Sequence, residues 1–276
     1  MQPVFDPTWL ASLHARASVE PRRPRLSLVA QGHPIGSLLA DLHADVPQFA
    51  AKKFHTLLQK QEQTGIAFWA LKGDLTSSLN QLADLMRSTG VGQVAHYWRG
   101  EQLAVWSESG ERLGSVERGA VRPLGIATRA VHLVGRTANG CIWVQQRALN
   151  KANNPGLWDT LMGGMVSSQD GLHSALQRET WEEAGLQTSD LLHLARRGRV
   201  TIARPSEGID IDPIGLAYTQ EDIDWFSCTV PDGVTPRNQD GEVAQFQLLS
   251  LPDLAERLQR DEFTLEATLI LVTAIS

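Results

Sequence analysis

The sequence predicts an α/β protein, with an α/β/α sandwich in the C-terminal part of the chain and a smaller α+β domain before it. Two observations predict this fold class. From about residue 124 onward, strand-like segments come first, then one polar helix, then further strands and two helices, which fits a sheet covered by helices. Before about residue 121, helices and strands follow an apolar pattern of their own. We expect an N-terminal helix and linker over 1–25, the α+β domain over 26–121 and the sandwich over 122–276.

In the first 121 residues, apolar spacing and turn signals predict three helices and three strands. One of these helices places Leu75, Leu79, Leu82 and Met86 on a single face. The predicted helices are Pro7 to Arg16, which precedes a Pro/Arg-rich linker over 18–25, then Pro47 to Gln61, and Leu75 to Arg87. The predicted strands are Leu26–Ala30, Leu103–Ser107 and Leu113–Glu117, the last two joined by a turn at Gly110.

The C-terminal part begins with a predicted hairpin, because Asn139-Gly140 is a strong two-residue turn signal between two apolar runs. A long polar helix follows, for which Ser167-x-x-Asp170 resembles a capping box and Gly185 supplies the stop. The predicted strands are Ala130–Gly135, Cys141–Arg147, Arg199–Ala203, Asp224–Val230 and Val243–Leu249. The last two predicted helices are Leu251–Gln259 and Leu265–Ile275.

The most informative segment is Gly164 to Leu186, within which three carboxylates fall in five residues. Glu179, Glu182 and Glu183 share an arc of about a third of the helix circumference. The same side carries apolar residues one to two turns earlier, so this side should face the protein: Leu172, Ala175 and Leu176. Three inward acids repel one another and resist desolvation unless a cation lies among them. Oxygen ligands of this kind suit Mg²⁺ or Mn²⁺.

This segment resembles the signature of the Nudix hydrolases, Gly-x5-Glu-x7-Arg-Glu-U-x-Glu-Glu-x-Gly-U, where U is a bulky apolar residue. The matching residues are Gly164, Arg178, Glu179, Glu182, Glu183, Gly185 and Leu186. Two positions depart from it: Asp170 stands in place of Glu, and Thr180 in place of an aliphatic residue. The resemblance implies the Nudix α/β/α sandwich for about 125–276 and hydrolysis of a diphosphate linked to another group.

The resemblance also implies roles for the residues of the box. Glu182 and Glu183 are expected to bind Mg²⁺ or Mn²⁺ directly, and Glu179 directly or through water. The carbonyl of Gly163 is a further candidate ligand, because a Gly-Gly turn lets the main chain approach closely. Arg178 is expected to lock the loop to the helix by pairing with Asp170 or with a loop carbonyl.

Five residues outside the box are further candidates. The general base is expected either from the box helix or from a later loop, where Glu242 is the candidate; a merely solvated acid is the alternative for Glu242. Asp240 is a candidate substrate-binding or metal-proximal group. Arg147 and Lys151 flank the loop that leads to the box and are candidates for binding the diphosphate, although a loop lysine can equally face solvent. Trp158 is predicted to stack on an aromatic ring of the substrate, with a core position as the alternative.

A narrower resemblance covers nearly the whole chain after Arg25. The segments 143–160 and 236–243, with looser similarity over 97–120, resemble the Nudix subgroup related to the region fused to thiamin pyrophosphokinase in some fungi. In that subgroup another domain precedes the Nudix domain. This resemblance implies hydrolysis of thiamin diphosphate or of its damaged forms, oxythiamin and oxothiamin diphosphate. The alternatives are hydrolysis of ADP-ribose, NADH or nucleoside triphosphates, isopentenyl-diphosphate isomerisation, and a non-catalytic ligand sensor.

Composition excludes several other classes of protein. The formal net charge of −6 and a pI near 5.8 argue against a nucleic-acid partner. No apolar run approaches the roughly 20 residues that span a bilayer, and the N-terminus lacks a signal-peptide layout, so we expect a cytoplasmic protein. Cys141 and Cys228 are expected to be reduced thiols. The expected partner is a small-molecule diphosphate, and a homodimer is expected only by analogy with the family.

Overall fold

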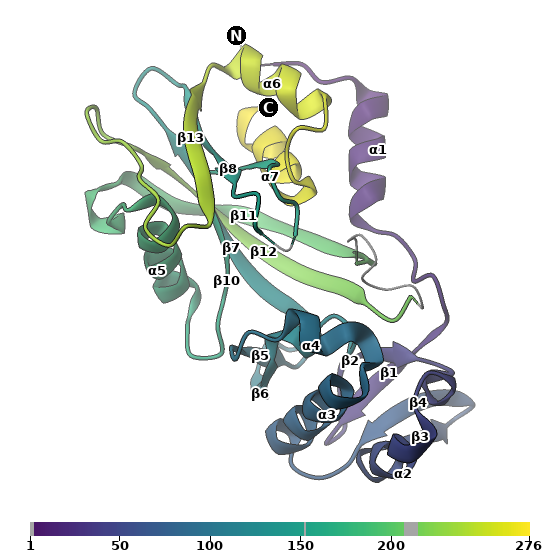
Figure 1. Ribbon diagram of the computed structural model, residues 1–276. Coiled ribbons are helices and arrows are strands. Elements are labelled where there is room, and N and C mark those ends of the chain that lie inside the picture. Colours follow the sequence, from purple (N-terminus) through teal and green to yellow (C-terminus); the bar gives the residue numbers. More distant parts are fainter. Residues whose placement is uncertain (1–2, 152, 207–214) are drawn as a thin grey trace.

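The protein, seen here in a computed structural model that describes residues 3–151, 153–206 and 215–276, has an N-terminal α+β region and a larger C-terminal sandwich (Figure 1). A four-stranded sheet in the order β2-β1-β4-β3 forms the base of the N-terminal region, and β5 pairs with β6 beside it. The strands are β1 Arg25–Ala30, β2 His33–Leu39, β3 Leu58–Gln63, β4 Ile66–Leu71, β5 Gln102–Trp106 and β6 Arg112–Glu117. The helices are α1 Pro7–Ala17, α2 Gln48–Leu57, α3 Leu75–Thr89 and α4 Val94–Tyr97.

The prediction of one helix from Pro47 to Gln61 is wrong in its second half. Helix α2 ends at Leu57, and Leu58–Gln63 forms strand β3, which pairs in antiparallel register with β4. Thr64 and Gly65 both have positive φ and make the tight turn between the two strands. Strands β2 and β4 were not predicted either. Hairpin pairing with the next segment of the chain outweighed the local helical spacing around Leu57.

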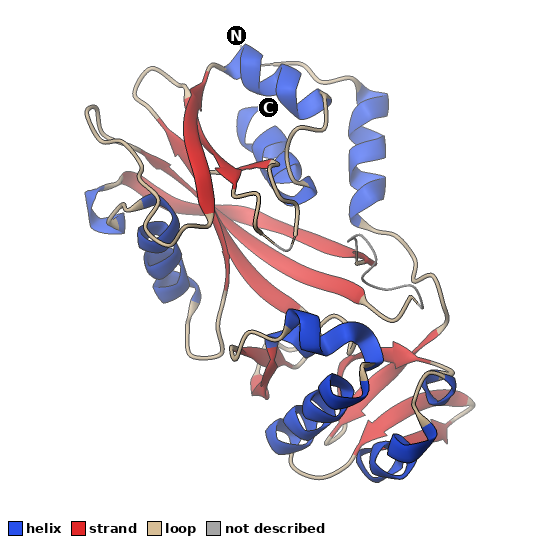
Figure 2. Ribbon diagram, in the orientation of Figure 1, coloured by secondary structure: helices blue, strands red, loops and turns tan. Residues whose placement is uncertain are grey.

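The C-terminal part is a mixed sheet with helices on both faces, as the sequence predicted (Figure 2). Its main path is β11-β12-β7-β8-β13, with β10 paired to β7 and β9 to β8. The strands are β7 Thr128–Arg136, β8 Ile142–Arg147, β9 Trp158–Asp159, β10 Met162–Met165, β11 Leu192–Pro205, β12 Tyr218–Thr229 and β13 Val243–Leu249. The helices are α5 Leu172–Ala184, α6 Leu251–Gln259 and α7 Leu265–Ile275.

The two faces of this sheet bury separate apolar cores because side chains alternate along each strand. On β7, Val131 and Leu133 pack with α5, whereas Ala130 and Val134 pack with α7 on the opposite face. Helix α7 is apolar almost all round and is nearly wholly buried. Helix α5 buries only one side, so its polar residues remain available at the edge of the sheet.

Helix α1 packs on the C-terminal sandwich, although it precedes the N-terminal region in sequence (Figure 1). Leu13 and Ala17 belong to the same core as α7, and Arg16 pairs with Asp261 at 2.6 Å. The amide of Val19 donates a 2.8 Å hydrogen bond to the carbonyl of Ala203 in β11. The residues predicted as a separate helix and linker therefore contribute to the sandwich core before the chain crosses to the N-terminal region.

The two regions are joined by further contacts that place residues 118–124 beside the sandwich. Leu216, just before β12, is buried in the N-terminal core. The amide of Ser168 donates to the carbonyl of Gln102, and the neighbouring Ser167 forms a bridge with Leu103. The loop before α5 thus rests on β5. No helix in the described part of the chain is long and apolar enough to cross a membrane.

Helix α5 begins one residue after Gly171, so the predicted capping box at Ser167-x-x-Asp170 is wrong. The amide of Gly171 donates to the Ser174 hydroxyl, and Ser167 instead bonds Asp170 within the preceding loop. The predicted stop is confirmed, because Gly185 has a φ of 63° in the left-handed region. Beyond this stop, the carbonyls of Glu182 and Ala184 accept hydrogen bonds from the amides of Gln239 and Arg237, which ties the loop before β13 to the helix end.

Substitution of Gly185 tests this junction. We expect Gly185→Ala to lower the free energy of unfolding by about 2–3 kcal/mol, because a left-handed φ disfavours alanine and its Cβ would lie 2.6 Å from the carbonyl oxygen of Arg237. Gly233→Ala is the matched control, since Gly233 has a φ of 81° but open space around a Cβ. It should cost only about 1 kcal/mol. Urea unfolding measures both; equal losses would show that the contact with Arg237 contributes nothing.

Candidate active site

The box helix α5 lies unusually close to strand β10. A Cβ on Gly164 would clash with the side chain of Glu179, and a Cβ on Gly163 would lie 2.6 Å from a ring carbon of His132. Glycine at position 164 therefore lets the carboxylate of Glu179 approach the backbone of the strand, and glycine at position 163 lets β10 pack against the ring of His132.

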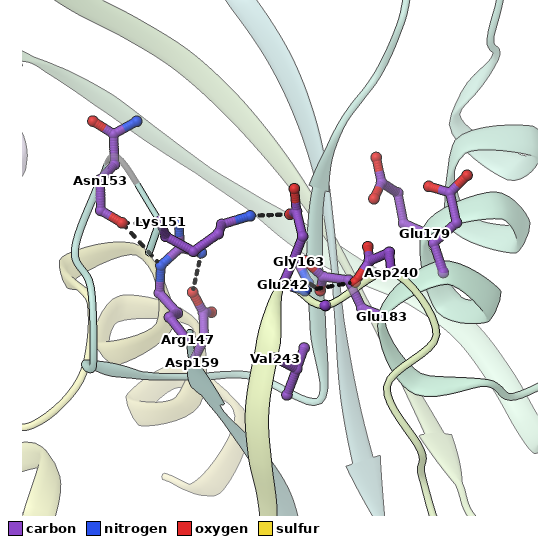
Figure 3. A network of polar contacts seen from close by, with 12 residues as sticks. Arg147, Lys151, Asn153, Asp159, Gly163, Glu179, Glu183, Asp240, Glu242 and Val243 are labelled. Carbon is purple, nitrogen blue, oxygen red and sulfur yellow. Dashed lines mark hydrogen bonds and ion pairs between the residues drawn. The ribbon is translucent and has the colours of Figure 1, made fainter. Parts of the chain in front are cut away.

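Glu183 is the most deeply buried acid of the box, with 2% of its surface exposed. Its Oε2 accepts hydrogen bonds from Gln145 Nε2 at 2.8 Å and from the Gly163 amide at 3.0 Å, the latter shown in Figure 3. Burial raises the pKa of Glu183 to about 8, and the charge of Glu179 adds to this, while the two hydrogen bonds oppose it. The protein therefore holds Glu183 protonated at neutral pH unless a cation compensates its charge.

Glu179 is largely buried, with 13% of its side chain exposed, and Arg178 balances its charge. Burial raises the pKa of Glu179 to about 7, partly offset by the charge and hydrogen bond of Arg178. Arg178 Nη1 lies 2.8 Å from Glu179 Oε1 and 3.0 Å from Glu182 Oε2. Glu182 is more accessible, with 42% of its side chain exposed. One guanidinium thus neutralises two of the three box glutamates.

Arg178 makes both contacts expected of it. Its Nη2 donates to Asp170 Oδ2 at 2.9 Å and to the Met165 carbonyl at 3.2 Å, so it joins the loop before α5 to the helix. Burial would raise the pKa of Asp170, but the hydrogen bonds from Arg178 and Ser167 outweigh it, and the pKa lies below its usual value. An aspartate is therefore long enough to serve at the position where the Nudix signature has glutamate.

Two cations predicted to bind substrate lie beside the box: Arg147 is the last residue of β8, and Lys151 lies on the loop that follows (Figure 3). Arg147 donates to the Asn153 carbonyl at 3.0 Å and lies 3.6 Å from Asp159. Lys151 forms an ion pair with Glu242, the candidate base. Burial opposes ionisation of Glu242, but the hydrogen bond and charge of Lys151 outweigh it, so its pKa is lowered. Glu242 is ionised in this arrangement, yet it is a weak base while Lys151 is bound to it.

Asp240 has a structural contact in addition to its place at the site. Its Oδ1 accepts a 2.8 Å hydrogen bond from the Glu242 amide, which shapes the turn into β13. Figure 3 shows Asp240 and Glu242 between the loop cations on one side and the box glutamates on the other. This position agrees with the one predicted for both residues, while their roles stay predictions.

All but one of the predicted site residues line a single cavity of about 320 Å³. These residues are Arg147, Lys151, Gly163, Arg178, Glu179, Glu182, Glu183, Asp240 and Glu242. A second cavity of about 370 Å³ adjoins the first, and Arg147, Lys151, Asp240 and Glu242 lie on the wall that they share. The site thus combines an acidic end at α5 with a space large enough for a small organic group.

Trp158 is the exception, and the predicted stacking role does not fit its position. It is 7% exposed, packs in the core under α6 and α7, and lines neither cavity. Its ring faces the guanidinium of Arg257 at 4.3 Å, and its backbone pairs with the segment before α7. The core position, left as the alternative by the sequence, is the observed one, because β9 turns this residue away from the cavity.

The box carboxylates do not form a ready-made metal cage. Among the described residues, no three His, Cys, Asp or Glu side chains are grouped so that they could hold a metal ion as they stand. The chemistry of the donors nevertheless fits a hard cation, since Glu179 and Glu183 are buried acids with raised pKa values. The Oε1 atom of Gln145, the side chain that bonds Glu183, is buried without a hydrogen-bond partner. An ion bound here would replace Arg178 as counter-charge, so the assignment of metal ligands stays a prediction.

Several residues of the site were not predicted from the sequence. Gln145 lies two residues from Arg147 on β8, and a polar residue at alternate spacing in an apolar strand was the signal available for it. Arg118, Arg122 and Glu221 line both cavities, but they come from the interdomain segment and from β12 and carry no local signal. Burial, followed by the charge of Glu266, raises the pKa of Glu221.

Comparison with known proteins settles the family of the C-terminal part, because the NUDIX domain matches residues 125–268. The chain belongs to the Nudix family. Nudix proteins of this pyrophosphohydrolase family typically use a divalent metal ion and act on small-molecule diphosphates. The match also agrees with the α/β sandwich and with the additional N-terminal region.

Three relatives show how far the similarity extends. The chain is 25% identical over 190 residues to the uncharacterised protein YJR142W of Saccharomyces cerevisiae, covering 63% of this chain and 54% of that protein. It is 28% identical over 152 residues to the chloroplastic Nudix hydrolase 20 of Arabidopsis thaliana, covering 54% and 38%. It is 30% identical over 163 residues to the isopentenyl-diphosphate Delta-isomerase of Streptomyces coelicolor, covering 59% and 77%. The matched part is about half or less of the length of the first two relatives.

The raised pKa values of Glu183 and Glu179 predict a pH-dependent effect of metal. In EDTA, the free energy of unfolding should fall by about 2–4 kcal/mol as pH rises from about 4.5 to about 8, because the unfolded chain ionises both acids first. Mg²⁺ should restore this loss at pH 8 and have little effect at pH 5. Urea unfolding at several pH values measures both effects. Glu183→Gln should remove most of the slope; a Mg²⁺ effect equal at pH 5 and pH 8 would contradict the assignment.

Proposed function

We propose that this protein is a divalent-metal-dependent hydrolase that splits an organic diphosphate into a monophosphate and phosphate. We propose further that its substrate is thiamin diphosphate or one of the damaged forms, oxythiamin and oxothiamin diphosphate. The observation that carries the hydrolase proposal is the single cavity in which the box glutamates face Arg147 and Lys151. A diphosphate site needs carboxylates that bind a hard cation and positively charged side chains that bind phosphate, and this cavity has both.

The thiamin proposal rests on the resemblance of segments 143–160 and 236–243 to the subgroup fused to thiamin pyrophosphokinase. Two features are consistent with it. An additional region precedes the Nudix domain, as in that subgroup, and the larger cavity lies between the two regions. Free thiols at Cys141 and Cys228 agree with our proposal of a cytoplasmic location.

In the proposed reaction, each side chain has a task that follows from its position. Glu182, Glu183, Glu179 and the Gly163 carbonyl would hold Mg²⁺ or Mn²⁺, which supplies neutralisation of phosphate charge and a more acidic water. Arg147, fixed by Asn153 and Asp159, binds a phosphate oxygen in a set orientation. Arg178 would hold the loop to helix α5 through Asp170 and the Met165 carbonyl when a metal ion replaces it as the counter-charge of Glu179.

Lys151 links substrate binding to the proposed base. In the structure its ammonium group is paired with Glu242 and keeps the pKa of that carboxyl low. A substrate phosphate that attracts Lys151 would weaken this pair and raise the basicity of Glu242. Glu242 would then accept a proton from the water whose oxygen bonds to one phosphorus, while the bond from that phosphorus to the bridging oxygen breaks and the other phosphate unit leaves with that oxygen.

Isomerisation of isopentenyl diphosphate is the second candidate, favoured by the 30% identity to the Streptomyces coelicolor enzyme. That chemistry needs a thiol beside the substrate. Cys228 is buried, burial raises its pKa to about 12, and it lines neither described cavity. Cys141 precedes β8 and lies about 20 Å along the strand from Arg147. These positions favour hydrolysis, and retention of all three box glutamates favours catalysis over a sensor.

A substrate panel tests the proposed function. We expect Mg²⁺-dependent release of phosphate and monophosphate from thiamin, oxythiamin and oxothiamin diphosphates, and no release with Glu183→Gln. The panel also contains ADP-ribose, NADH, dGTP and isopentenyl diphosphate. Preference for one of these would keep the hydrolase and remove the thiamin substrate. Turnover of isopentenyl diphosphate to its isomer, without phosphate release, would replace hydrolysis by isomerisation.

The role of Glu242 has its own test. We expect Glu242→Gln to lower kcat at least about tenfold with the Tm little changed, since a general base contributes about 10²–10⁴-fold. Glu256→Gln is the matched control, because Glu256 is an acid on α6 that pairs with Arg260 and lines neither described cavity. Steady-state kinetics across pH 6–9 measure the effect. Unchanged kcat in Glu242→Gln would remove this residue from the mechanism.

A further inference from the structure

The N-terminal region forms one wall of the larger cavity beside the box. It contributes Gly92, Tyr97, Arg99, Arg118, Gly119 and Val121, and the sandwich contributes the remainder. Gly119 is needed here, because a Cβ would lie 2.9 Å from the backbone of Tyr97. Pro123 and Ile126 add apolar surface at the same end of the cavity. The larger cavity therefore has an apolar part that is absent from the acidic cavity at α5.

Four cations line the wall shared by the two cavities, and they differ in how their charge is compensated. Arg118 pairs with Glu101 at 2.7 Å, Arg147 lies near Asp159, and Lys151 pairs with Glu242. Arg122 has no ion pair within the described residues. Its Nη1 donates only to the neutral Asn153 Oδ1, at 3.2 Å. Among these four cations, Arg122 is thus the one that makes no direct contact with an acid in the described part of the chain.

The backbone of Arg122 is held firmly although its side chain is lightly bound. Its carbonyl accepts hydrogen bonds of 3.0 Å from the amides of Tyr218 and Gly125. Val121 and Leu124, on either side, are buried in the N-terminal core. The backbone therefore fixes the position of Arg122 at the junction of the two regions. Its guanidinium has to break only the hydrogen bond to Asn153 in order to bind another group.

We propose that the N-terminal region completes the substrate site, with the organic group in the larger cavity and Arg122 bound to the diphosphate at the shared wall. This inference rests on the proposed hydrolase function and names a binding residue that the box does not contain. A terminal phosphate carries about −1.5 to −2 charge near pH 7, and a guanidinium binds two of its oxygens at once. The apolar residues beyond Arg122 then contact the organic group, which places the scissile bond toward α5.

Two variants of Arg122 and one control test this assignment in the full-length protein. We expect Arg122→Gln to raise KM for thiamin diphosphate about tenfold or more, with kcat changed less than about threefold, because the contact is made in the bound ground state as well. Arg122→Lys should recover part of the loss, since it keeps the charge without the fork. Arg112→Gln, at an exposed arginine on β6 that lines neither described cavity, should match the wild type.

Calorimetry separates this inference from the proposed function. Imidodiphosphate, a diphosphate that resists hydrolysis, is titrated with Mg²⁺ into the wild type and into each variant. Affinity lowered about tenfold in Arg122→Gln, but not in Arg112→Gln, supports the assignment even if no substrate of the panel is turned over. Unchanged KM and unchanged imidodiphosphate affinity in Arg122→Gln would overturn it while leaving a hydrolase in place. A wild type that binds no imidodiphosphate would overturn it too.

Discussion

The structure of the site depends on one constraint, which is that ionisable glutamates are buried where a helix meets a strand. Gly164 leaves room for the side chain of Glu179 against β10, and Gln145 and the Gly163 amide supply hydrogen bonds to Glu183. The cost of burying this charge explains the raised pKa, and the guanidinium of Arg178 limits the same cost for Glu179. Gly164, Gln145 and Arg178 each serve the burial of acids at this junction: Gly164 gives Glu179 room, Gln145 bonds Glu183, and Arg178 pairs with Glu179.

The path of the chain around the sandwich explains how an N-terminal region can belong to this site. Helix α1 contributes Leu13 to the sandwich core, then the chain leaves to form the N-terminal region and returns through residues 118–127. Leu216 enters the N-terminal core from the other direction. Because the two regions exchange buried residues, their relative position is fixed by packing and not by a linker alone. The wall of the larger cavity is therefore as well defined as either core.

Local sequence information was sufficient where a single segment decides the structure. Val243–Leu249, Leu251–Gln259 and Leu265–Ile275 are observed with the predicted bounds, because strand alternation, a Ser cap and helical periodicity agree there. It was insufficient at Leu58–Gln63, whose strand exists only by pairing with β4. The site shows the same division. The spacing of the box predicted the inward positions of Glu179 and Glu183, whereas the side chain of Glu182 is 42% exposed. Arg122 and Gln145 reach the cavity through the fold, and Trp158 leaves it because β9 pairs with β8.

The balance of charge in the cavity argues for an order of binding. In the described part of the chain, nine Asp or Glu side chains and five Lys or Arg side chains line the cavity at α5. Four of the five cations, Arg118, Arg147, Lys151 and Arg178, already contact acids of this same group. A diphosphate anion approaching this surface is repelled by the remaining carboxylates, and protonation of Glu183 relieves only part of that repulsion. A divalent cation that enters first, or together with the substrate, offsets much of this negative charge and attracts the diphosphate locally. Without a metal ion, the protein group available to bind the anion lies at the shared wall, where Arg122 makes no direct contact with an acid among the described residues. The site thus attracts its two occupants at opposite ends, and each reduces the electrostatic cost of binding the other.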